Sequence, residues 1–200
     1  MPRINPEYRR DAKKKIIDAA IEAASEKGVT AVTLEDIAQR VGVTKGALYA
    51  YFESREVLFR EMTLEVFTRI RSEIEKAFCE LGEGPETFSR IADLLFGDLK
   101  SYTNIVVQIS LITPQDPELQ KVVITIQDRI IAFIGDKISR MQKEGIVPPG
   151  VPPEELAQAI LALGIGLRIT ELHLKKDPGR LKQVWLDSVF RLLSLKAGTV

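Results

Sequence analysis

The chain has 200 residues, 45% of them hydrophobic, and its 28 basic and 28 acidic side chains give a formal net charge of zero. This length suits one compact domain or a small domain beside a larger one, and it excludes several independent hydrophobic cores. Since the pI is near 6.6, a nucleic-acid partner has to be argued from local charge and not from the balance of the whole chain.

Cysteine and histidine usage limits the chemistry that the chain can carry. Cys79 is the only cysteine and His173 the only histidine, which excludes an intramolecular disulfide and a Cys/His metal cluster. Residues 1–15 are polar and basic, unlike a signal peptide, and the most apolar run, residues 156–169, is shorter than the roughly 20 residues of a membrane span. We expect a cytoplasmic protein without metal, cofactor or membrane contact.

Apolar residues recur at helical spacing in nearly every segment between glycine and proline breaks, and no sustained strand-like alternation is found. The sequence therefore predicts an all-α fold. The expected helices run from about Pro6 to Lys27, Leu34 to Val41, Lys45 to Tyr51, Ser54 to Leu81, Glu86 to Ser101, Asn104 to Ile112, Pro117 to Lys143, Pro153 to Leu174 and Gly179 to Leu195.

The first three expected helices share one small core. Thr33 is placed to cap the second helix, which ends at Gly42, and Thr44 is placed to cap the third. Three side chains are available to fill the space between the helices: Val43, Leu48 and Phe52. We expect a three-helix domain over residues 1–54, joined by the long fourth helix to a larger helical domain over residues 55–200.

Two short helices joined by a tight turn with glycine are the parts of a helix-turn-helix, whose second helix can enter the DNA major groove. The third helix displays small, hydroxyl and basic residues away from its apolar side: Thr44, Lys45, Gly46, Ala47, Tyr49 and Tyr51. Basic residues also gather before and in the first helix, where they could reach phosphates or a minor groove: Arg3, Arg9, Arg10, Lys13, Lys14 and Lys15. A solvated helix start is the alternative for this basic run, and packing over the helix ends is the alternative for the two tyrosines.

Two segments of this region, Thr33-Leu-Glu-Asp-Ile-Ala and the run from Val41 to Leu58, closely resemble the DNA-binding signature of the TetR family of transcriptional regulators. The resemblance covers about residues 16–58. It implies a helix-turn-helix domain, a divergent helical domain for effector binding and dimerisation, and a homodimer on a pseudo-palindromic operator.

The resemblance also implies roles for the matching positions. Backbone-contacting positions are Thr33, Thr44, Tyr49, Tyr51 and Arg55, and base-facing positions are Lys45, Gly46 and Ala47. Tyr51 departs from the histidine often found in the family, and Arg55 from the lysine, so the geometry of their phosphate contacts would differ. Ala47 has no hydrogen-bonding group, which leaves only apolar readout at that position.

A dimer on two half-sites has to hold its recognition helices about 34 to 36 Å apart. The last two helices are the candidates for the contact, because each carries an apolar stripe. The stripes comprise Leu156, Ala159, Ile160, Leu163 and Leu167, and then Leu181, Val184, Trp185, Ser188, Val189 and Leu192. Gly164 and Gly166, with Ala159 and Ala162, would permit close helix contact; the alternative is that both stripes face the core of the monomer.

An effector site is predicted only as a set of large or polar residues on the helices of the second domain. The candidates are Phe67, Phe88, Phe96, Tyr102, Gln108, Ser110, Thr125, Arg129 and His173. For Gln108, a hydrogen-bonded amide in the core or a contact in an interface is an equal alternative to effector contact. For His173 the alternative is a position at the surface or in an interface.

The sequence therefore predicts a ligand-responsive transcriptional regulator and not an enzyme. We expect a repressor that a small apolar or amphipathic effector releases from its operator. An enzyme acting on a lipid-like substrate is the first alternative, but no paired acidic metal motif, nucleophile-histidine arrangement or glycine-rich phosphate loop supports it. The second alternative, a helical protein-binding adaptor, leaves the basic, hydroxyl-rich third helix unexplained.

Overall fold

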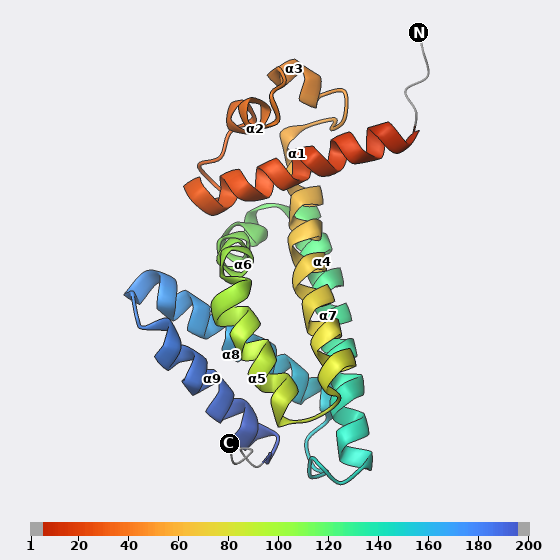
Figure 1. Ribbon diagram of the computed structural model, residues 1–200, viewed down its shortest axis with the longest axis vertical. Helices are drawn as coiled ribbons and strands as arrows, with labels where there is room; N and C mark the ends of the chain where they lie inside the picture. The colour runs from red at the N-terminus through yellow and green to blue at the C-terminus, as the bar shows by residue number, and fades with distance from the viewer. Residues whose placement is uncertain (1–5, 196–200) are drawn as a thin grey trace.

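A computed structural model describes residues 6–195 and confirms the all-helical fold (Figure 1). The helices are α1 (Pro6–Lys27), α2 (Leu34–Val41), α3 (Lys45–Leu48), α4 (Arg55–Leu81), α5 (Pro85–Asp93), α6 (Lys100–Ile112), α7 (Pro117–Lys143), α8 (Pro153–Leu174) and α9 (Pro178–Leu192). Helices α1 to α3 form one end of the molecule, with α3 at its tip, and α4 leads from them into the body beside α7 (Figure 1).

The three-helix end has its own small core, as expected. Ala20, Ile37, Leu48 and Phe52 are almost completely buried there. Val43 does not join them: it lies in the turn between α2 and α3 and is 41% exposed, which corrects the expected core. The first turns of α4 belong to the same packing unit, because α4 packs on α1 and Glu61 pairs with Lys13 at 2.8 Å.

The helix α3 is shorter than expected. It ends at Leu48, and the chain continues to Tyr51 in tight turns in which Ala50 N–H donates to Ala47 O and Tyr51 N–H to Leu48 O. These bonds span three residues, as in a 3₁₀ turn, and replace the four-residue bonds of an α-helix. The end of α9 is also earlier than expected, at Leu192 instead of Leu195.

The junction of α5 and α6 is the largest departure from the expected elements. A π-helical segment, Leu94–Asp98, continues α5, and the chain bends at Leu99, whose N–H donates to Leu94 O at 2.8 Å. The expected break at residues 102–103 is therefore wrong. Thr103 lies inside α6, and its hydroxyl group donates across the bend to Leu95 O at 3.2 Å.

Helix α8 is long and apolar enough to cross a membrane by length and composition alone, although core helices of soluble proteins pass the same test. It packs against α6, α7 and α9 within the folded body. Its Arg168 and Glu171 are buried and paired with each other. Only 33% of its most apolar window is buried in the single chain, so much of this helix has an uncovered apolar face.

Candidate functional site

Local interactions fix both ends of α2. Thr33 Oγ1 accepts from Asp36 N–H at 3.2 Å and Asp36 Oδ2 accepts from Thr33 N–H at 2.9 Å, a reciprocal capping box at the start of α2. Gly42 ends α2 with a φ of 79°, a left-handed conformation that favours glycine. The caps expected from the sequence are thus confirmed.

The outer side of α3 is open to solvent. Thr44 Oγ1 accepts from Ala47 N–H at 3.3 Å and caps the helix, and Leu48 packs inward with 1% exposure. Thr44, Lys45, Gly46 and Tyr49 are exposed, and Ala47 is half-buried. These residues form one face at the tip of the molecule, at the place where Figure 1 shows α3.

Lys45 shares this face with an acidic residue that the sequence analysis missed. Its ammonium lies 2.6 Å from Glu35 Oε1, across the turn from α3 to α2. Hydrogen bonding between the two side chains raises the pKa of Lys45 and lowers the pKa of Glu35. Both are surface groups, so water and salt screen the pair, and Lys45 can leave Glu35 for another anion at little cost. The spacing of Glu35 and Lys45 across a tight turn was the signal that could have found this pair.

Two of the predicted backbone-contacting residues are held inside the domain. The Arg55 guanidinium donates to Val32 O at 3.2 Å and lies 4.2 Å from the centre of the Phe59 ring. Tyr51 is half-buried and packs against the core. Thr33 is exposed, but its hydroxyl serves the capping box. The structure therefore gives Arg55 and Tyr51 a packing role, and Thr33 a capping role, in addition to any contact with a partner.

The basic first helix divides into anchored and free cations. Arg9 donates to Ala50 O at 3.2 Å, and Lys13 pairs with Glu61 and lies 4.9 Å from the centre of the Phe52 ring. Three further cations of α1 are exposed: Arg10, Lys14 and Lys15. Arg3 lies outside the described residues.

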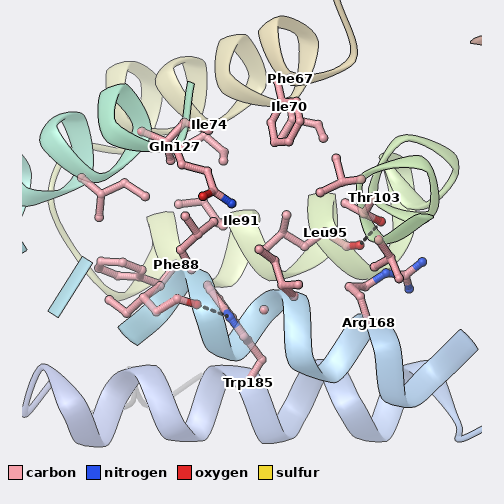
Figure 2. Close-up of a pocket in the computed structure, with 18 of the residues that line it drawn as sticks. Phe67, Ile70, Ile74, Phe88, Ile91, Leu95, Thr103, Gln127, Arg168 and Trp185 are labelled. Carbon is pink, nitrogen blue, oxygen red and sulfur yellow. Dashed lines mark hydrogen bonds between the residues drawn. The ribbon is translucent and has the colours of Figure 1, made fainter. Parts of the chain in front are cut away.

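The second domain encloses an apolar cavity of about 80 Å³ between α4, α5, α6, α7, α8 and α9. Phe67 and Phe88 line it, as the sequence suggested (Figure 2). Its few polar groups come from Thr103, Gln127, Arg168 and Trp185, of which Figure 2 shows the Gln127 amide pointing inward from α7. The sequence analysis missed Gln127 and Arg168; a lone polar residue between buried apolar neighbours, such as Gln127 between Ile126 and Ile130, is the signal that could have found them.

The other effector candidates lie elsewhere. Phe96 is buried beneath the Arg168 guanidinium, Tyr102 accepts from Arg69 at 3.2 Å, and Gln108 accepts from the Val29 backbone N–H at 2.8 Å. The remaining candidates are exposed: Ser110, Thr125, Arg129 and His173. The sequence could not separate the candidates that line the cavity from those that do not. Helical periodicity predicts which side of a helix faces the core, but not which residues of other helices lie opposite that side.

The apolar stripes of α8 and α9 are divided between two faces. Part of each stripe is buried in the monomer: Leu156, Ile160, Leu181, Trp185 and Val189. The rest is exposed or half-buried: Ala159, Leu163, Leu167, Val184, Ser188 and Leu192. Gly164 faces inward, because a Cβ there would lie 3.3 Å from Trp185 Nε1, whereas a Cβ at Gly166 would meet nothing within 4 Å.

Comparison with known proteins agrees with this architecture. The family model for bacterial regulatory proteins of the tetR family matches residues 16–62, which reaches from α1 into α4. The HTH-type transcriptional regulator YhgD of Bacillus subtilis is 28% identical over 163 residues, covering 78% of this chain and 82% of that one. The negative transcriptional regulator IcaR of the Staphylococcus epidermidis biofilm operon icaADBC is 25% identical over 140 residues, covering 68% and 76% of the two chains.

The fold of the chain also resembles that of a solved regulator. A TetR transcription regulator from Haloarcula marismortui superimposes with a TM-score of 0.79 at 16% identity, covering 92% of this chain and 97% of that one. This family consists of regulators and not of enzymes, as the sequence predicts. With a capped helix-turn-helix, an exposed recognition helix and these relatives, the chain belongs to the TetR family and is a DNA-binding transcriptional regulator.

Proposed function

We propose that the protein is a homodimeric repressor that a small apolar or amphipathic effector releases from a pseudo-palindromic operator. The observation that carries this proposal is the pairing of an exposed recognition helix at one end with an apolar cavity in the body, joined by the uninterrupted helix α4. The sign of regulation is argued from the relative IcaR, which is described as a negative regulator.

Residues 1–54 would act as the DNA-binding unit and residues 55–200 as the unit for effector binding and dimerisation. On the operator, Lys45, Gly46 and Ala47 would face base edges in the major groove. The backbone contacts would come from Thr33, Thr44, Tyr49, Tyr51 and Arg55.

Dimerisation is proposed through the uncovered side of α8 and α9. Val184 and Leu192 are 41% and 44% exposed, and the open side of Gly166 would let a partner helix approach closely. Such a two-fold contact would give the dimer two copies of α3, one for each half-site of the operator.

The effector would act by changing the space between the helices. Ligand pockets for small molecules usually measure roughly 300–1,000 Å³, and this cavity is about 80 Å³, so a ligand of that size has to move the cavity walls. Phe67, Ile70, Ile74 and Phe78 of α4 are part of those walls. An effector that binds only the widened state would tilt α4 and reorient α3, which is the differential affinity that allosteric release requires.

The proposal is tested by selecting genomic fragments on the immobilised protein and measuring affinity for the selected duplex with and without candidate effectors. Lys45→Ala should weaken binding and relax the preference for the selected duplex. Unchanged operator affinity and specificity in this variant would refute the role of α3. An effector that binds the protein and leaves operator affinity unchanged would refute the coupling.

A further inference from the structure

A buried arginine with one unused donor lies at the end of the apolar cavity. Arg168 is 2% exposed and lines the cavity beside Thr103 (Figure 2). Its two terminal nitrogens are occupied: Nη1 donates to Glu171, and Nη2 donates to Asn104 and to Lys100 O. The third donor, Nε–H, is buried and has no partner among the described residues. An unpaired buried donor is costly, so an acceptor is missing next to Nε of a residue that lines the cavity.

The charges around Arg168 favour an anionic acceptor. Glu171 is shared between Arg168 and Lys100, whose ammonium lies 2.7 Å from Glu171 Oε1. Two cations therefore face one carboxylate, and a second carboxylate would balance the cluster. Burial lowers the pKa of the Arg168 guanidinium, and Glu171 opposes this shift, so an added anion would further favour the charged arginine.

The other residues that line the cavity determine the chemical character of the ligand away from its head group. Aliphatic and aromatic side chains of α4, α5 and α7 cover its walls, among them Phe67, Phe88 and Ile130. The Gln127 amide is the polar group on the α7 side (Figure 2). A molecule that fits has an apolar chain or ring with a single oxygen-bearing head at the α8 end.

We propose that the effector is an apolar monocarboxylate whose carboxylate accepts a hydrogen bond from Arg168 Nε–H while its apolar part occupies the cavity. This inference deepens the proposed function and rests on it for the word effector, but binding itself can be measured without DNA. Trp185 is the single tryptophan of the chain, is 1% exposed and lines the same cavity, so its fluorescence reports occupancy directly.

The test titrates the full-length protein with straight-chain carboxylates from butanoate to decanoate and with the matching alcohols and methyl esters, following Trp185 emission. Octanoate should bind about tenfold more tightly than octanol. The hydrogen bond from the charged arginine to a carboxylate is stronger than the hydrogen bond from the same arginine to a neutral hydroxyl group. A cavity that offers only apolar contact would give the reverse order, since the carboxylate is harder to desolvate. Tighter or equal binding of octanol or of the ester therefore overturns the proposal.

A variant locates the contact. Arg168→Lys keeps a cation beside Glu171 but removes Nε–H, so the preference for octanoate over octanol should fall to about twofold or less. Arg71→Lys is the control, because Arg71 Nε also makes no hydrogen bond within the described residues, although it lies 3.3 Å from Glu75 Oε1, and because Arg71 does not line the cavity; the preference of this variant should stay as in the unsubstituted protein. A full preference in Arg168→Lys, with cooperative thermal unfolding retained, overturns the assignment. If Arg168→Lys fails to unfold cooperatively, the order of affinities in the unsubstituted protein decides alone.

Operator binding separates this inference from the proposed function. Octanoate that binds through Arg168 and leaves operator affinity unchanged supports the carboxylate site and refutes the coupling. Release of DNA by a neutral amphiphile, with no binding of any carboxylate in the series, supports the coupling and refutes the carboxylate site.

Discussion

At the scale of single residues, the ion pair between Lys45 and Glu35 determines the charge of the exposed face of α3. Glu35 pairs with the ammonium of Lys45. If Lys45 enters the major groove as proposed, Glu35 would add a negative charge close to the DNA phosphates. We expect Glu35→Gln to tighten binding to every duplex roughly two- to fivefold at low salt, because one repulsion is removed. Lys45→Ala should lower the slope of log affinity against log salt by about 1 if the ammonium also neutralises a phosphate.

Fluorescence anisotropy over a range of salt concentrations measures both changes. Lys121→Ala on α7 is the control, because it removes an equal charge from another exposed ion pair, with Glu118. Weaker general binding by Glu35→Gln would mean that Glu35 itself accepts from a base, as acidic side chains do from cytosine.

Arg55 is expected to matter for stability as well as for DNA binding. Its hydrogen bond to Val32 O ties the start of α4 to the loop before α2, and its contact with the Phe59 ring, one turn along α4, holds the guanidinium in place. Arg55→Ala should lower the free energy of unfolding by about 1–2 kcal/mol, measured by urea denaturation without DNA. Arg60→Ala, one turn further along α4 and with only a 3.9 Å contact to Asp116, should have a smaller effect. Equal effects of the two variants would contradict this anchoring role.

The capping box at α2 is sensitive to acid. Hydrogen bonds from Lys27 and then from Thr33 lower the pKa of Asp36 from 3.8 to about 2. The carboxylate form is thus favoured in the folded protein, so its stabilising effect is complete above pH 3.8 and is lost as the pH falls toward 2. Asp36→Asn should be less stable than the unsubstituted protein at neutral pH, and chemical denaturation should show this difference vanish across that acid range. A difference that persists at pH 2 would contradict the pKa shift.

At the scale of elements, α6 connects the cavity to the DNA-binding unit. Thr103, Val106 and Val107 line the cavity, and Gln108 on the same helix accepts from Val29 N–H in the loop after α1. Gly28 is needed beside this contact, because its φ is +91° and a Cβ would lie 3.0 Å from Gln108 Oε1. Movement of α6 would therefore reach α1 directly, in addition to the route through α4.

Gln108→Leu tests this second route. Leucine keeps the side chain's bulk but leaves Val29 N–H unpaired, at a cost of about 1–3 kcal/mol in stability. We expect the variant to bind the operator and the effector but to show a smaller change of operator affinity when the effector is added, in paired anisotropy titrations. Thr125→Leu on the exposed side of α7 is a control for a polar-to-apolar change. An undiminished effector response in Gln108→Leu would assign the coupling to α4 alone.

Local sequence signals predicted most elements because the interactions that end a helix are themselves local. Thr33, Thr44 and Gly42 cap helices within a few residues of their own position, and these ends are confirmed. The bend at Leu99 was missed because a π-helical segment has no strong residue signature. Contacts such as Arg55 with Val32 and Arg168 with Asn104 join residues far apart in the chain, and no helical periodicity reports them.

At the scale of the whole molecule, the proposed dimer can be tested at the open side of Gly166. A side chain there would meet no atom of its own chain within 4 Å, so Gly166→Arg should leave the monomer folded. If α8 and α9 form the proposed interface, the arginine should drive two cationic side chains together and prevent dimerisation. Light scattering should then give the mass of one chain, and operator affinity should fall at least tenfold.

Ile124→Arg is the control for this change, because Ile124 is 49% exposed on α7 and is not part of the proposed interface. It should remain dimeric. A dimeric Gly166→Arg variant, or a monomeric Ile124→Arg variant, would move the interface to another face of the molecule.

Neighbouring residues of α8 lie on opposite sides of the helix: Gly164 and Arg168 border the cavity, and Gly166 faces outward. In the proposed dimer the two cavities would lie back to back, separated by little more than the thickness of two helices, about 20 Å. Ligand binding in one cavity would push on the α8 helix of its own subunit, and through the interface on the α8 helix that borders the other cavity. Occupancy of the two subunits would then be thermodynamically linked, and saturation curves for the effector would deviate from a simple hyperbola in proportion to how far α8 shifts.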